Sequence, residues 1–170
     1  TMDANALRAM QAPYKDKYKS DPNAAVITLK AHGTLDESKI ACKVETGRAL
    51  AVAGLHPATG GSGAELCSGD MLLEALVACA GVTLKAVATA LDIPLKAGTV
   101  KAEGDLDFRG TLGVDKEAPV GFREIRLSFD IDTDAPQDKI DSLIKLTERY
   151  CVIFQTLNKP PKLGLTVNRV

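Results

Sequence analysis

Apolar and polar residues alternate along two neighbouring segments, 99–108 and 121–132, with the apolar side chains at every second position. In the second segment, GFREIRLSFDID, the apolar series is Ile125, Leu127, Phe129 and Ile131. A period of two is typical of a strand with one buried and one solvated face. We therefore expect two strands here, joined as a hairpin by the loop at 109–120.

Further strand-like runs lie on either side of this pair. The runs AVITLKAHGTL (25–35) and SKIACKVET (38–46) predict another hairpin, and residues 48–52 predict a third short strand. Near the C-terminal end, apolar residues again occupy every second position after a proline pair, at Leu163, Leu165 and Val167. This alternation predicts a final strand.

Apolar spacing of three and four residues predicts a long helix from about Asp70 to Asp92. It follows a glycine-rich loop at 60–69 and ends before Pro94, which disfavours further helix. The stripe expected to face the core is Leu72, Leu76, Cys79, Thr83 and Val87.

Two other segments favour helix. One starts near Pro136 and leads into the sequence CVIF at 151–154. The other covers residues 4–18, where Pro13 interrupts the pattern. Because proline removes a backbone donor and clashes with the preceding turn, we expect one short helix there with an irregular continuation.

The element order of strands, long helix, strand pair, helix and strand predicts an α+β fold of two layers with antiparallel pairing. At 170 residues, the chain has the length of one ordinary domain, and it shows no internal repeat or linker. Hydrophobic residues make up 45 % and charged residues 25 %, which excludes a disordered or collagen-like chain.

Charge and histidine content exclude several classes of function. The 21 Lys and Arg residues oppose 22 Asp and Glu residues, giving a net charge of −1, so neither nucleic acid nor a membrane is expected as a partner. His32 and His56 have no Cys or carboxylate at ligand spacing, so we expect no metal and no cofactor. The N-terminal segment lacks the apolar core of a signal peptide, and the long apolar helix contains Glu74 and Lys85. We expect a soluble cytoplasmic protein.

The four cysteines are the remaining reactive groups. Cys79 and Cys151 lie in or beside different helices of one core. There they serve either as small packing residues or as a pair close enough to reduce peroxides. Cys67 precedes the long helix, whose N-terminus favours a thiolate, whereas the nearby Asp70 opposes it. Cys42 alternates inward on its strand and is expected to be structural.

Two motifs resemble those of the OsmC/Ohr family. GLHPATGGSGAELCSGDMLLEALVACAGVTL (54–84) resembles the glycine-rich loop and central helix, in which a carboxylate precedes a cysteine by nine or ten residues. RYCVIFQTL (149–157) resembles the second cysteine motif of the family. With the strand pattern, the resemblance covers roughly residues 25–170 as a single OsmC-like domain. Residues 1–24 are expected to form an N-terminal extension that contains a short helix.

This resemblance implies antiparallel sheets packed on a long central helix in an intertwined homodimer. It also implies a thiol-dependent peroxidase that reduces organic hydroperoxides, with a thiol reductant, in oxidative stress defence. By position, Cys79 corresponds to the peroxidatic cysteine, Cys151 to the resolving cysteine and Asp70 to the family's carboxylate.

One expected residue of the family has no counterpart on the early strand. Peroxidase members carry an arginine there that pairs with the carboxylate, whereas residues 25–35 offer only Lys30 and His32. Arg149 and Arg48 are the candidates to supply a guanidinium instead.

Helix geometry separates the carboxylate from the first cysteine. Nine helical residues span about 13 Å, and nine steps of about 100° place Asp70 on the face opposite Cys79. Contact between them therefore requires an unwound helix start or a second subunit.

Two other functions fit the same residues. One is a non-catalytic homodimer of the same fold that binds a small apolar or acidic ligand, with the cysteines as packing residues. The other is a redox sensor or protein-interaction module that uses Cys67.

Overall fold

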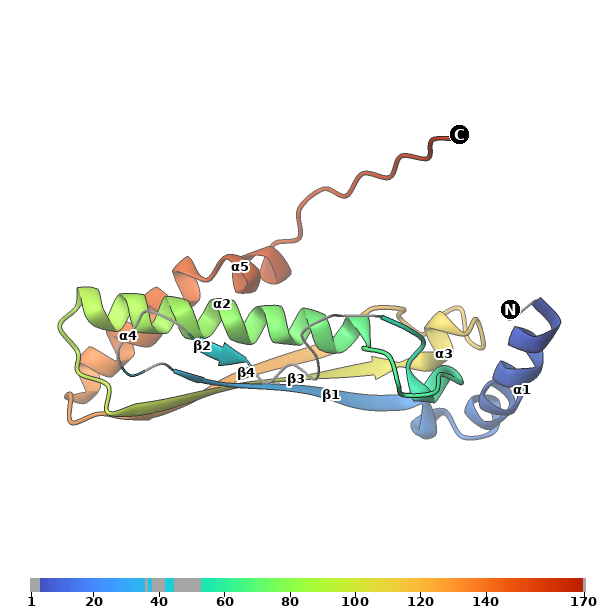
Figure 1. Ribbon diagram of the computed structural model, residues 1–170, viewed down its shortest axis with the longest axis horizontal. Helices are drawn as coiled ribbons and strands as arrows, with labels where there is room; N and C mark the ends of the chain where they lie inside the picture. The colour runs from blue at the N-terminus through green and yellow to red at the C-terminus, as the bar shows by residue number, and fades with distance from the viewer. Residues whose placement is uncertain (1–3, 36, 38–41, 45–52, 170) are drawn as a thin grey trace.

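The computed structural model describes residues 4–35, 37, 42–44 and 53–169, with side chains for all of these except 4–8, 29, 31 and 42–44. Within them, one antiparallel sheet forms a layer, and the long helix α2 lies along it as a second layer (Figure 1). The strand order is β2-β1-β3-β4. The predicted α+β fold with antiparallel pairing is confirmed.

The elements have these bounds. The strands are β1 Val26–Leu35, β2 Cys42–Val44, β3 Ala97–Asp107 and β4 Phe122–Asp132. The helices are α1 Ala4–Ser20, α2 Ser68–Ala90, α3 Phe108–Thr111, α4 Gln137–Tyr150 and α5 Val152–Asn158, with two 3₁₀ turns, η1 Pro22–Ala25 and η2 Pro57–Thr59.

The alternation in β3 and β4 separates a buried face of the sheet from a charged one. Val100 and Ala102 of β3 are fully buried beneath α2. On the opposite face, Lys30 Nζ lies 2.8 Å from Glu103 Oε1, and Arg126 donates to both carboxylate oxygens of Asp105 at 2.8 and 3.0 Å. One face therefore builds the core, and the other is solvated through cross-strand ion pairs.

Helix α2 supplies most of the core. Its buried residues are Leu73, Leu76, Val77, Ala80, Gly81, Leu84 and Ala88. This stripe differs from the predicted one, because Leu72 is 37 % exposed and Cys79 is half-buried. Since α2 is apolar almost all round, its spacing alone does not select one face. In the described ranges, it is the one helix with the length and composition of a membrane span, and it packs as a core helix on the sheet and α4.

The prediction of a short, interrupted N-terminal helix was wrong. Helix α1 is continuous across Pro13. Its C-terminal part is held by Tyr18, which is 2 % exposed and donates its hydroxyl to the carbonyl of Ala58. Burial of this aromatic side chain offsets the backbone hydrogen bond that proline removes.

Two other predictions differ from the structure. The loop at 109–120 begins within the short helix α3, and residues 159–169 form no strand. This C-terminal tail is extended and leaves α5 away from the sheet (Figure 1). The apolar residues do alternate there, but a strand needs a neighbouring strand for its backbone hydrogen bonds. The predicted strand at 48–52 lies outside the described residues.

Candidate functional site

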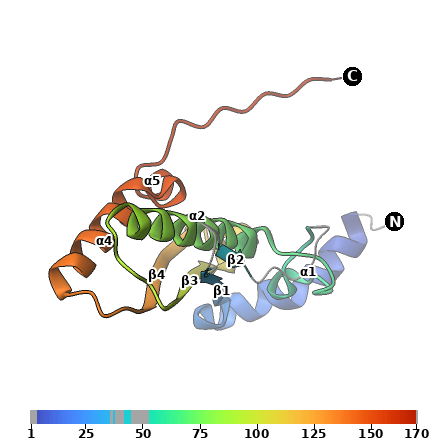
Figure 2. The same cartoon turned by 60° about the vertical axis from the view of Figure 1, so that its left-hand side comes forward.

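Cys79 and Cys151 are brought together where α2 meets α4 and α5. Cys79 is half-buried on α2, and Cys151, 1 % exposed, lies at the junction of α4 and α5. Figure 2 shows both helices beside α2. The Cys151 amide donates to the carbonyl of Thr147 at 2.9 Å, and its own carbonyl accepts from Gln155 at 2.9 Å. The backbone on both sides of this cysteine is therefore fixed.

The two thiols are free, and Cys79 lies close enough to Cys151 to act on its pKa. Burial raises the pKa of Cys151 to about 11, and the neighbouring Cys79 thiol acts in the same direction. The backbone amides of Phe154 and Ile153 act in the opposite direction. Cys151 is consequently a neutral thiol at pH 7 and can donate its S–H to the Cys79 sulfur.

An apolar cavity of about 270 Å³ lies against Cys151. Its walls are mainly Leu127, Phe129, Ile144 and Phe154. Glu148 also lines it, a residue that sequence reasoning missed. The available signal was its position three residues before Cys151 at the end of a helix, where such residues share one face.

The predicted supporting residues do not join this pair. Asp70 lies in the first turn of α2. Burial raises the pKa of its carboxyl, and His56 lowers it. Arg149 places its guanidinium 5.5 Å from the centre of the exposed Tyr150 ring. Arg48 lies outside the described residues.

The remaining cysteines lie elsewhere. Cys67 is the N-cap residue of α2, twelve residues before Cys79 or about 18 Å along the helix, and lines a second cavity. Cys42 lies in β2 opposite Leu35. Its side chain is not among those that the structure describes, so the expectation that it faces inward stays a prediction.

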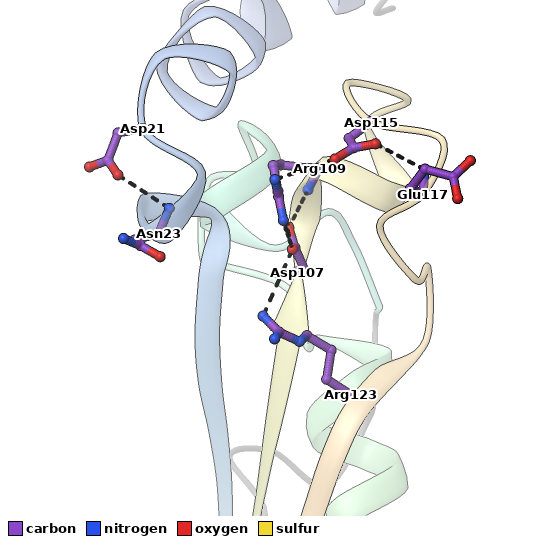
Figure 3. Close-up of polar contacts among 7 residues, drawn as sticks. All are labelled: Asp21, Asn23, Asp107, Arg109, Asp115, Glu117 and Arg123. Carbon is purple, nitrogen blue, oxygen red and sulfur yellow. Dashed lines mark hydrogen bonds and ion pairs between the residues drawn. The ribbon is translucent and has the colours of Figure 1, made fainter.

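A buried carboxylate that sequence reasoning missed lies at the end of β3 (Figure 3). The Asp107 side chain is 1 % exposed, and Arg109 Nη2 donates to its Oδ2 at 2.6 Å. Hydrogen bonds from Arg109 lower the pKa of Asp107. The Asp107 Oδ1 also accepts a hydrogen bond from the Arg109 amide at 3.1 Å, and Arg123 Nη1 lies 4.0 Å from the Asp107 Oδ2. This ion pair fixes the turn from β3 into α3.

The family model for OsmC-like proteins matches residues 61–166. The chain belongs to the OsmC-like protein family. The matched region contains Cys67, Cys79 and Cys151, whereas α1, β1 and His56 precede it. No curated protein matches the chain.

Two solved structures of OsmC-like proteins have a similar fold. One is an OsmC-like hydroperoxide resistance protein from Jannaschia sp. CCS1, with a TM-score of 0.61 and 16 % identity over 86 % of this chain and 97 % of that one. The other is an OsmC-like protein from Mycoplasma pneumoniae, with a TM-score of 0.54 and 19 % identity over 79 % of this chain and 86 % of that one. At these identities, the likeness establishes the fold.

Alkylation of Cys151 in this OsmC-like chain is expected to accelerate with pH up to about 11, because only the thiolate reacts and the thiol remains protonated below that pKa. Pulse labelling with iodoacetamide and peptide mass spectrometry measures the rate, with circular dichroism at each pH to verify folding. If the alkylation rate reached half of its maximum at about pH 8.5, the ordinary thiol pKa, the result would contradict the raised pKa of Cys151.

Proposed function

We propose that the protein is a homodimeric thiol-dependent peroxidase that reduces organic hydroperoxides through Cys79 and Cys151, with an external dithiol as reductant. The observation that carries this proposal is the proximity of the two free thiols at the meeting point of α2, α4 and α5, where Cys79 acts on the pKa of Cys151. The fold shared with the Jannaschia sp. CCS1 protein, which is described as a hydroperoxide resistance protein, supports the same choice.

The reaction begins at the sulfur of Cys79. Its thiolate attacks the terminal oxygen of ROOH, the O–O bond breaks, and RO⁻ leaves and takes up a proton, which gives ROH and a sulfenic acid. The sulfur of Cys151 then attacks the sulfenic sulfur and releases water, forming a disulfide. An external dithiol returns two electrons and two protons by disulfide exchange.

The assignment of the two roles rests on the position of the proton. Cys151 is more deeply buried, and its raised pKa keeps the proton on this residue at neutral pH. We therefore assign the attack on the hydroperoxide to Cys79 and the resolving step to the protonated Cys151 thiol. The apolar cavity against Cys151 offers space for the alkyl group of a hydroperoxide.

The homodimer in this proposal is supported by the C-terminal tail. Leu163, Leu165 and Val167 are 86 %, 94 % and 80 % exposed, which is costly for three apolar residues in strand-like alternation. Within the described residues, β4 pairs only with β3, so its other edge is open. We infer that the tail of a second copy adds to this edge.

The surroundings of β4 suit such an added strand. An apolar groove of about 490 Å³ runs beside it, lined by Phe122, Ile125, Leu127, Phe154 and Leu157. Leu127 and Phe154 also line the cavity at Cys151. A strand at this edge would therefore cover the thiol pair and exclude water from it.

One observation favours the non-catalytic alternative. In the described part of the chain, the only charged residue lining the Cys151 cavity is Glu148, whose carboxylate disfavours a nearby thiolate. The catalytic proposal therefore requires a cation from Arg48 or from the second copy, whereas the ligand-binding alternative requires none.

Trapping of the sulfenic acid separates the two functions. We expect Cys151→Ser, treated with one equivalent of cumene hydroperoxide, to bind one dimedone at Cys79, because no resolving thiol remains. The wild-type protein, treated identically, is the control and should bind little dimedone. Unlabelled Cys79 together with unconsumed hydroperoxide would favour the non-catalytic alternative.

A further inference from the structure

A second cavity, of about 440 Å³, lies at the end of the molecule where α1, α3 and the start of α2 gather (Figure 1). We call this cavity the helix-start chamber. Its apolar walls include Leu72, Leu106, Phe108, Leu112 and Phe122. Its size falls within the range of small-molecule sites, which combine apolar walls with a few polar groups.

His56 is the polar group that defines the chemistry of the chamber. Its Nδ1 accepts a hydrogen bond from the Ala58 amide at 3.0 Å, so the neutral ring carries its proton on Nε2. The ring stacks on Phe108 with centroids 4.9 Å apart. Burial lowers the pKa of His56, although Asp70 acts against this shift. In the described part of the chain, Nε2 has no hydrogen-bond partner, so His56 can donate to a molecule in the chamber.

The charges around the chamber disfavour an anionic occupant. Asp107 lines it, but its carboxylate is already paired with Arg109. Asp70 lies close enough to His56 for each to shift the pKa of the other. A carboxylate ligand beside His56 would therefore meet the charge of Asp70. An uncharged acceptor gains the hydrogen bond without this repulsion.

The N-terminal helix contributes to the chamber. Gln11 of α1 lines it, and the hydroxyl of Tyr18 ties α1 to the carbonyl of Ala58, two residues after His56. The region matched by the family model starts at residue 61, after both Gln11 and His56. The chamber is thus built partly from segments outside the matched region.

We propose that the helix-start chamber binds a small, uncharged aromatic carbonyl compound, whose oxygen accepts a hydrogen bond from His56 Nε2 and whose ring packs against the apolar walls. This site is separate from the Cys79–Cys151 pair and does not depend on it.

Three probes of similar shape test the proposal by equilibrium dialysis: 2-acetylnaphthalene, 2-ethylnaphthalene and 2-naphthoate. The neutral ketone should bind about tenfold more tightly than the hydrocarbon, because only the ketone accepts the hydrogen bond. It should also bind more tightly than the carboxylate at pH 7. Equal binding of ketone and hydrocarbon, or tightest binding of 2-naphthoate, would overturn the proposal.

Two variants locate the binding. His56→Phe keeps an aromatic ring against Phe108 but has no donor, and should remove the preference for the ketone over the hydrocarbon. Gly121→Leu should weaken binding of all three probes at least tenfold, because Gly121 lines the chamber and a larger side chain there takes up its space. A Cβ at Gly121 meets no atom within 4 Å, so the fold should accommodate the substitution. Circular dichroism establishes that each variant folds. Retention of the ketone preference in His56→Phe would refute the assigned donor.

The alkylation rate of Cys67, which lines the chamber, reports whether the chamber is occupied. The bound ketone should slow alkylation of Cys67 by iodoacetamide, whereas alkylation of Cys79 should be unchanged. Cys79→Ser should bind the ketone as the wild type does, so loss of peroxidase activity and loss of ligand binding are distinguishable. Unchanged alkylation of Cys67 at saturating ketone would place the ligand elsewhere and overturn the proposal.

Discussion

Replacing Cys79 by serine is expected to lower the rate of hydroperoxide consumption by at least about 10³-fold, because a serine hydroxyl is not ionised at neutral pH and forms no sulfenic acid. The measurement is peroxide consumption with cumene hydroperoxide and dithiothreitol in excess. The substitution is nearly isosteric, and Cys79 is half-buried, so the fold should be retained.

Cys67→Ser is the matched control for this variant. Cys67 lies at the start of the same helix but lines a different cavity. Its replacement should therefore leave the rate close to that of the wild type. A Cys79→Ser protein that consumes hydroperoxide as fast as Cys67→Ser would remove Cys79 from the chemistry.

If the protein forms the proposed homodimer, removal of residues 160–170 is expected to leave it monomeric. Leu163, Leu165 and Val167 each contribute roughly 1.5–3 kcal/mol when they are buried against a partner, and all three are exposed in the single chain. Light scattering after size-exclusion chromatography measures the mass in solution.

Single substitutions test the direction in which the tail faces. Leu165→Asp should weaken dimerisation strongly, because it places a charge on the apolar side of the alternation. Thr166→Asp adds the same charge on the other side of the same strand and should have a much smaller effect. Equal dimerisation of both variants and the wild type would show that the tail lies outside the interface.

The sheet was predictable because its two faces differ in chemistry. On β3 and β4, apolar residues facing α2 alternate with charged residues such as Glu103 and Arg126, which form ion pairs on the outer face. The alternation of apolar and charged residues is visible directly in the sequence of each strand. The C-terminal alternation follows the same rule, yet it forms no strand, because no strand among the described residues pairs with it.

The faces of the helices were harder to predict, for two physical reasons. Helix α2 is apolar almost all round, so the choice of Leu73 rather than Leu72 for the core depends on what packs against it. Helix α1 continues through Pro13 because Tyr18 is anchored to a segment forty residues away. Both outcomes depend on tertiary contacts that a local pattern does not contain.

The candidate site was predictable only in part. The sequence indicated that Cys79 and Cys151 lie on helices of one core, and the structure brings Cys79 close enough to act on the pKa of Cys151. The sequence did not indicate Glu148 at the Cys151 cavity or the orientation of Arg149 over Tyr150. Those features depend on the turn between α4 and α5, where the chain changes direction at Cys151.

The most direct test of the redox pair is the mass of the protein after one equivalent of cumene hydroperoxide. We expect the denatured, non-reduced chain to lose two hydrogens, and its peptide map to contain one disulfide between Cys79 and Cys151. Addition of dithiothreitol should restore the original mass. Two free thiols at these positions, with the hydroperoxide unconsumed, would contradict the proposed peroxidase activity of Cys79 and Cys151.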